Sequence, residues 1–510
     1  MALVFIAAFL LSLAIVAVAF ALGAKSWALL AMPGVLALAP FAFRNPQAIL
    51  LGMIALIPLD VFAVLPGQTA AALTFTKLLF PAATAILFLR YLVSYDRRVS
   101  LHAIDRWLLI WAIYSALGVL IAVDRPTALN DFRRSLSMWL FYLVLSRSFV
   151  EAVWQKRLLA TVRITVGISV AIGIGTYLTG NNPFSTMSSE GDVSDSITRI
   201  TGASSISPNL FATFLLLPLS VSLFAIVGRR GRARFWGFVG AGLMMTGLVL
   251  TFSRSAFLVM GTMLLLFTAM SWKKIHPAWF ATALLLVVAS LPAVPGRYWE
   301  RMATLFAFDT SGQQDISLWR RTNYLRVGAR ILADHPVFGA GPGNFRVLHA
   351  RAEYQQEVSL IGMERVAHNM YLTVVTEGGV VGAVIFGGFL FASLRSAWRL
   401  RRMTGEVGLH ARAVLLALIG LLMLGMFQVM ALNKYLWLML ATIRALSERS
   451  RRELAAITHA QQWAQYANAA AEDGHGSAPP PAIEPTPLES PGIGGGRAPG
   501  WAPSLRPGEH

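Results

Sequence analysis

Long apolar stretches separated by short polar segments run along most of this 510-residue chain. A helix needs about 20 mostly apolar residues to cross the hydrocarbon core of a bilayer. Stretches of that kind predict fourteen spanning helices, at 2–22, 27–43, 46–65, 72–94, 104–123, 131–149, 158–178, 207–227, 234–252, 254–271, 277–294, 369–394, 411–428 and 431–447. Prolines interrupt residues 27–65, so a count of twelve is the alternative. The pattern therefore predicts an all-α polytopic membrane protein with about 12–14 transmembrane helices.

Two longer polar segments interrupt the series, at 179–206 and at 295–367. Within the second segment, residues 316–333 have the apolar spacing of a helix, and a His-Pro pair followed by glycines ends it. After the last span, residues 446–472 predict a helix of mixed charge, and a Pro/Gly-rich tail follows from Gly474. Three parts result, namely N-terminal transmembrane helices (1–199), a membrane domain that includes the large loop (200–447) and a C-terminal helix and tail (448–510).

Basic residues orient the spans. With a cytoplasmic N-terminus, the inside loops collect most of the Lys and Arg, as the positive-inside rule requires. Arg133 and Arg134 are the exception on the outside. Both termini are then cytoplasmic, and 295–367 is one large, partly helical periplasmic loop. The first 22 residues lack a basic start and a clear cleavage site, so we expect a retained span rather than a signal peptide.

Composition excludes several classes of protein. Only 13% of the residues are charged, against about 25% in soluble globular proteins. A net charge of +18 would suggest nucleic-acid binding in another class of protein, but the basic residues here lie in short clusters between apolar runs. We therefore expect membrane lipids and no nucleic acid as partners. The chain contains 0 cysteines, which excludes disulfides, thiolate metal sites and cysteine nucleophiles.

Charged groups at membrane depth are candidate functional residues, because burying them there is costly. Arg254 lies in the sequence Ser-Arg-Ser, in an outer turn so short that two predicted spans almost meet. A guanidinium at this place can bind a diphosphate through its fixed fork of donors. The alternative is an arginine that extends to the lipid headgroups without further function.

His368 and Asn369 stand at the outer start of the span that follows the large loop. An imidazole titrates near neutral pH and can accept a proton from a sugar hydroxyl. Glu377 lies about 13 Å deeper in a regular helix, so it is not expected to orient His368 directly. Gly378, Gly379 and Gly382 form a small-residue face for close helix packing. A polar residue at a helix N-terminus, with no chemistry, is the alternative for His368.

The large loop carries four arginines at spacings of one to five residues, namely Arg320, Arg321, Arg326 and Arg330. Several of them fall on one side of a helix, although each alone is also typical of a solvated basic face. The glycine-rich segment 339–345 looks like a phosphate loop, but it lacks the lysine and the preceding strand of a nucleotide site. We predict a tight turn that returns the loop to the membrane.

Missing motifs narrow the chemistry. The sequence has no paired-Asp motif on a cytoplasmic loop, no clustered His/Asp/Glu metal set and no Walker sequence. These absences disfavour cytoplasmic nucleotide-sugar chemistry and ATP-driven transport. Metal-free chemistry on an anionic, already activated donor outside the cytoplasm is compatible with the sequence.

The segment from His368 resembles the signature of the O-antigen ligase/polymerase superfamily. That signature is His-Asn, nine residues, Gly, two residues and Gly, met here by His368, Asn369, Gly379 and Gly382. Three further pieces fit in the right order, namely Ser207-Pro208-Asn209, Ser253-Arg254-Ser255, and the segment from His335-Pro336 to Phe345. The resemblance covers roughly residues 200–445. The predicted span count and the long tail depart from the family, whose members commonly have twelve spans.

The resemblance implies a metal-independent, inverting glycosyltransferase of the bacterial inner membrane, without a cofactor. Its donor would be an undecaprenyl-diphosphate-linked glycan, and its acceptor would be lipid A–core or a growing glycan on the periplasmic side. Arg254 and a loop arginine, Arg321 with Arg320 as its rival, would bind the diphosphate. His368 would activate or orient the acceptor hydroxyl. The supporting residues would be Asn369, Glu377, Gly379, Gly382 and Asn209.

Other functions stay open at this point. A repeat-unit polymerase for O-antigen or exopolysaccharide and a protein O-oligosaccharyltransferase would use the same donor. A flippase for lipid-linked glycans would bind the diphosphate without chemistry, but a transporter needs a polar path across the membrane. Asp60 and Lys77 lie near outer span ends, and the inner halves of the spans are nearly free of charge. This distribution favours an outward-facing site.

Overall fold

The computed structural model describes residues 45–60, 101–180, 199–204, 207–274, 316–355 and 360–473. The predicted spans at 2–22, 27–43, 72–94 and 277–294 lie outside these ranges, as does the tail from Gly474. The chain divides into two compact units, Met1–Arg451 and Arg452–His510. All the site residues considered below belong to the first unit.

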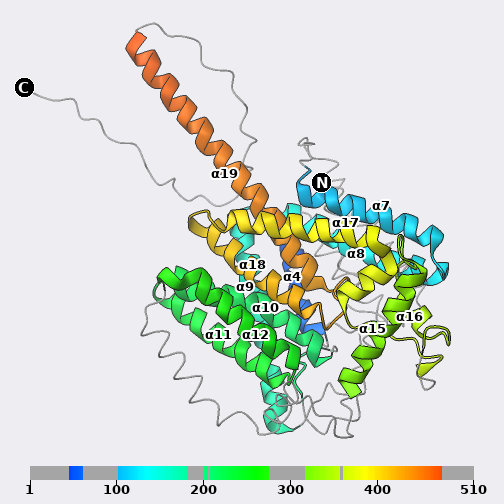
Figure 1. Cartoon of the computed structure of the whole chain (residues 1–510). Coiled ribbons are helices and arrows are strands. Elements are labelled where there is room, and N and C mark those ends of the chain that lie inside the picture. The colour runs from blue at the N-terminus through cyan, green and yellow to red at the C-terminus, as the bar shows by residue number, and fades with distance from the viewer. Residues whose placement is uncertain are drawn as a thin grey trace, which may run out of the picture. The chain divides into compact units, whose positions relative to one another are not determined.

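Every regular element in the described ranges is a helix, which confirms the all-α polytopic class (Figure 1). The longer helices are α4 (Pro46–Leu56), α7 (Ala103–Ile121), α8 (Arg125–Ser148), α9 (Ala152–Thr179), α10 (Pro208–Gly228), α11 (Arg232–Leu250), α12 (Arg254–Ser271), α15 (Ile316–Asp334), α17 (Met370–Leu400), α18 (Gly405–Leu424) and α19 (Lys434–Asp473). The shorter ones are the six-residue helix α16 (Asn344–His349) and the 3-10 turns η1 (Ile57–Leu59) and η3 (Trp272–Lys274).

Seven of these helices are long and apolar enough to cross a membrane, namely α7, α9, α10, α11, α12, α17 and α18. Each corresponds to a predicted span, because long apolar runs are the strongest signal in such a sequence. Three predicted spans differ from the structure. Of the span 46–65, the described residues 46–60 contain the short helix α4 and the turn η1, and 131–148 of the span 131–149 belong to the longer, arginine-rich α8. Residues 431–447 and 446–472, predicted as two elements, form the single helix α19.

Helix α10 lies at the centre of the packing, in contact with α9, α11, α12 and α18. Glycines let the backbones approach closely, as is common between membrane helices. A Cβ on Gly247 of α11 would lie 2.5 Å from the Leu215 side chain of α10. A Cβ on Gly420 of α18 would lie 2.5 Å from the sulfur of Met263 in α12. This close packing fixes the ends of α10, α11 and α12 relative to one another.

A buried ion cluster joins α7, α8 and α19 at the end of α7 that is predicted to be cytoplasmic. The Asp105 carboxylate accepts hydrogen bonds from Arg444 Nε at 2.9 Å and from the Tyr142 hydroxyl at 2.8 Å. Arg444 also pairs with Glu448, at 3.3 Å. The expectation that the inner halves of the spans are nearly free of charge misses this cluster. Its charges are mutually paired, so they do not form an open polar path.

Replacing Arg444 by Ala should lower the thermal stability of the detergent-solubilised protein. The Asp105 carboxylate, whose side chain is 2% exposed, would lose its nearest cation, at a cost of about 3–5 kcal/mol. Arg395→Ala, at an exposed position on α17, serves as the control and should leave the Tm unchanged. Equal Tm values for both variants would show that the cluster contributes nothing to stability.

Candidate functional site

Helix α17 is broken at Gly379, whose backbone angles are φ 62° and ψ −166°. Only glycine adopts such angles without strain. A Cβ at this position would also lie 2.3 Å from the carbonyl oxygen of Val337 in the large loop. The predicted role of Gly379 in helix packing is therefore wrong, because its neighbour is loop backbone. Gly382 does pack against a helix, since a Cβ there would lie 3.0 Å from the Tyr114 ring of α7.

The loop fills the break with its own backbone. Four main-chain hydrogen bonds connect the two segments, from Ala340 N to Thr376 O (2.9 Å), Gly341 N to Glu377 O (3.0 Å), Val380 N to Pro336 O (2.9 Å) and Val381 N to Val337 O (3.2 Å). The Tyr114 hydroxyl of α7 adds bonds to the carbonyl oxygens of Gly378 and Phe338. The backbone groups at the break are thereby paired within the protein, as a helix that crosses a bilayer requires.

The glycine-rich segment 339–345 surrounds the side chain of Glu377. One carboxylate oxygen accepts a hydrogen bond from Gly343 N at 2.8 Å, and the other accepts one from Phe345 N at 3.2 Å. Gly339, Gly341 and Gly343 all have positive φ angles, which lets successive N–H groups converge. The resemblance to a phosphate loop thus has a physical basis, because N–H groups of the segment converge on the oxygens of a carboxyl group of the same chain. The segment is also the turn that returns the loop to the membrane.

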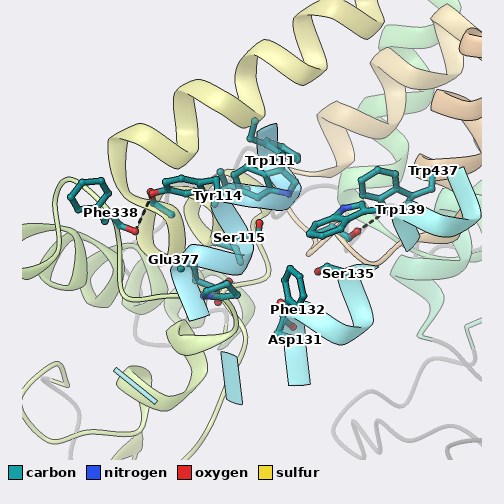
Figure 2. A pocket seen from close by; sticks show the side chains of 17 residues that line it. Trp111, Tyr114, Ser115, Asp131, Phe132, Ser135, Trp139, Phe338, Glu377 and Trp437 are labelled. Atoms are coloured by element: carbon teal, nitrogen blue, oxygen red, sulfur yellow. Dashed lines mark hydrogen bonds between the residues drawn. The ribbon is translucent and has the colours of Figure 1, made fainter. Parts of the chain in front are cut away.

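A small cavity lies beside this loop, between α7, α8 and α17 (Figure 2). Aromatic side chains form much of its wall, among them Trp111, Trp139 and Trp437, and two carboxylates line it, Asp131 and Glu377. Its volume is about 60 Å³, which is room for a few water molecules rather than for a sugar ring. The cavity is therefore not a ready-made substrate site. The sequence offered one signal for Asp131, an acidic residue at the outer start of a predicted span.

His368 directly precedes α17 in an uncommon backbone conformation, with φ 47°. Asn369 is the N-cap of the helix, and its side-chain oxygen accepts hydrogen bonds from Tyr371 N at 2.9 Å and Leu372 N at 3.1 Å. The His-Asn pair therefore has a definite local structure, in which Asn369 caps the helix and the positive φ of His368 turns the chain away from the helix axis. Backbone strain of this kind is concentrated at functional sites. The His368 side chain is half-buried.

Helix α15 carries Arg321 and, one turn later, Tyr324, which contacts His368. The Arg321 guanidinium lies over the ring of Phe427, with 5.2 Å to the centroid. One turn further along α15, the Tyr324 ring lies 5.9 Å from the His368 ring. The turn that holds Phe427 also accepts a hydrogen bond from the start of α17, from Met370 N to Gly425 O at 2.7 Å. Tyr324 and Phe427 belong to no motif and were missed in the sequence.

Part of the large loop has a small core of its own, in which Tyr324, Ile331, Phe345 and Leu348 are buried. His349 is fully buried beside them and interacts through Nδ1 with Met363 O at 2.9 Å. Burial lowers the pKa of His349, so this imidazole is neutral at physiological pH. Its ring contacts Tyr324 at 5.4 Å, so Tyr324 is in contact with both His349 and His368. The described part of the loop is thus packed against the start of α17.

Arg254 is the first residue of α12, directly after its N-cap Ser253. The short turn before it is held by Arg199, which donates to Thr251 O at 2.9 Å and to the Asn209 side chain at 2.9 Å. Arg199 therefore joins the beginning of α10 to the turn that carries Arg254. The sequence showed Arg199 only as one basic residue of an outer segment.

The predicted residues thus form two groups. One holds Asn209 and Arg254, and the other holds Arg321 and His368. A hydrogen bond from Asn433 Nδ2 to Thr213 Oγ1, at 3.0 Å, joins α10 to the turn between α18 and α19. The same turn carries Phe427, which contacts Arg321 of the second group. Arg320 lies next to Arg321 on α15 and is half-buried.

Residues 239–387 match the protein-family model described as O-antigen ligase. This confirms the resemblance to the O-antigen ligase/polymerase superfamily and supports a ligase- or polymerase-type enzymatic function. The matched residues include α12, the described part of the loop and both sides of the break in α17. A comparison with curated proteins finds no match.

Replacing Gly379 by Ala should lower the Tm and expose segment 339–345 to proteases. The new Cβ meets the Val337 carbonyl, and the positive φ costs about 1–3 kcal/mol in addition. Gly387→Ala is the matched control on the same helix, because its Cβ would have no neighbour within 4 Å. If both variants resist heat and proteolysis as the wild type does, the break is not a fixed feature of α17.

Proposed function

We propose that this protein transfers an undecaprenyl-diphosphate-linked oligo- or polysaccharide to an acceptor hydroxyl at the periplasmic face of the inner membrane. The supporting observation is the placement of His368, within an O-antigen ligase domain, beside the helix that carries Arg321. The reaction belongs to the biosynthesis of cell-surface polysaccharide such as lipopolysaccharide. Both termini lie in the cytoplasm, in agreement with the distribution of basic residues.

The donor is bound through its diphosphate by Arg254 and by a loop arginine, Arg321 or its rival Arg320. Arginine suits this role because its planar fork of donors matches phosphate oxygens and keeps its charge at any working pH. The two arginines come from different elements, α12 and α15, which the α18–α19 turn and α10 connect. The polyprenyl chain of the donor stays in the lipid while its diphosphate reaches these outer helix ends.

His368 takes the proton of the acceptor hydroxyl. The hydroxyl oxygen forms a bond to C1 of the donor sugar from the side opposite the diphosphate, so the anomeric configuration inverts. The bond between C1 and the phosphate oxygen breaks, and undecaprenyl diphosphate leaves with both bonding electrons. The arginines stabilise the negative charge that develops on the leaving group. The reaction needs no metal, because guanidinium groups supply the positive charge.

The other residues support this site. Asn369 caps the start of α17 next to His368, and the Asn209 side chain accepts a hydrogen bond from Arg199 near the turn that carries Arg254. The absence of a side chain at Gly379 and Gly382 leaves room for the loop backbone and for the Tyr114 ring, respectively. The acceptor is lipid A–core in a ligase or a growing glycan in a polymerase. We place the ligase first because the matched family model is described by that activity.

His368→Ala should reduce glycan transfer by about 100-fold or more, the usual contribution of a general base. Arg254→Ala should abolish transfer, and Arg254→Lys should also fail, because lysine provides a single point charge instead of a fork. Protein level and membrane insertion should stay at wild-type values. Transfer is measured as glycan on the acceptor after each variant is returned to a deletion strain.

Arg351→Ala is the control for these variants, because Arg351 is an exposed loop arginine paired with Glu353. It should transfer glycan as the wild type does. Normal transfer by both His368→Ala and Arg254→Ala would refute the site. Single repeat units on the acceptor of the deletion strain would identify a polymerase, whereas bare acceptor with unlinked long polymer is expected for a ligase.

A further inference from the structure

We propose that Glu377 is a positioning residue, whose carboxylate holds the periplasmic loop so that Tyr324 keeps His368 in place for proton transfer. The proposal rests on the proposed function of His368. Glu377 itself does not touch the substrate in this account, because its two oxygens bind Gly343 N and Phe345 N.

The contacts of Glu377 concentrate on one short stretch of loop. Its carboxylate binds two N–H groups, and its main-chain oxygen accepts the N–H of Gly341 at 3.0 Å. The carbonyl oxygen of Thr376, the preceding residue, accepts a hydrogen bond from Ala340 N. Two consecutive helix residues therefore hold four N–H groups of the segment 339–345.

The segment is also confined from the opposite side. A Cβ built on Gly343 would lie 2.9 Å from the Cβ of Asp131 in α8, so only glycine fits between the two helices. On the same side, Asp124 N donates to the Asn344 side chain at 2.7 Å. Contacts on both sides thus confine segment 339–345, so a substitution of Glu377 should change the position of this segment.

Phe345 connects this segment to His368. Its N–H binds Glu377, and its ring, 1% exposed, contacts Tyr324 at 6.5 Å. Tyr324 in turn contacts the His368 ring at 5.9 Å. His368 has a positive φ, which is uncommon for a residue other than glycine, so its conformation depends on the packing around it. The path from Glu377 to His368 therefore contains two aromatic rings, both of them in the loop core.

The first test compares Glu377→Gln with the wild type in the full-length protein. A glutamine side chain has one acceptor oxygen, and its NH₂ group would face an N–H donor. The kcat of transfer should fall about tenfold or more, whereas the KM for the lipid-linked donor should stay within about twofold. Glu377→Asp keeps both carboxyl oxygens and should recover part of the kcat. Glu353→Gln, at an exposed carboxylate of the same loop, should behave as the wild type.

The second test does not depend on activity. Because the chain contains 0 cysteines, spin labels can be attached to Val366→Cys, two residues before His368, and to Leu258→Cys on α12. Both positions are exposed. The distribution of the distance between the labels should broaden in Glu377→Gln and stay narrow in Glu353→Gln. If the distance distribution broadens in Glu377→Gln but the wild-type protein itself transfers no glycan, the positioning role is supported and the proposed function is refuted.

Two results would overturn the proposal. One is a wild-type kcat for Glu377→Gln together with an unchanged label distance. The other is a loss of Tm, kcat and donor binding in parallel, without recovery in Glu377→Asp, because that pattern indicates a residue needed only for folding.

Discussion

A helix that crosses a bilayer must keep its backbone polar groups paired, and α17 does so with the help of a second segment. At Gly379 its own ladder is interrupted, and Val380 N and Val381 N donate to carbonyl oxygens of the loop instead. This exchange ties the large loop to a membrane helix over a short distance. The remaining site follows from it, since the same loop carries the core in which Tyr324 contacts His368.

The arrangement suits a donor with a lipid tail. Such a substrate leaves its diphosphate at the membrane surface, so the residues that bind it should lie at helix ends rather than in an enclosed cavity. Arg254 begins α12 and His368 directly precedes α17, while Arg321 contacts the turn between α18 and α19. The cavity beside the described part of the loop holds about 60 Å³, too little for a glycan.

Much of the fold follows from hydropathy alone. The spans predicted at 104–123, 158–178 and 207–227 correspond to α7, α9 and α10, because a bilayer demands long apolar runs. The break in α17 was not predicted, because a Gly-Gly pair in an apolar run is equally typical of close helix packing. The Asp105–Arg444 pair was missed because its members lie 339 residues apart.

The candidate site shows the same division. His368, Asn369, Gly379 and Gly382 could be found because they stand at fixed spacing in one motif. The contacts of the Glu377 side chain could not, because its partners are N–H groups of a loop 32 and 34 residues away. The most direct measurement uses the purified protein in vesicles with an undecaprenyl-diphosphate-linked glycan and an acceptor. The account predicts that undecaprenyl diphosphate is released in equal amount to the glycan joined to the acceptor. Movement of intact lipid-linked glycan between the leaflets, without release of undecaprenyl diphosphate, would contradict it.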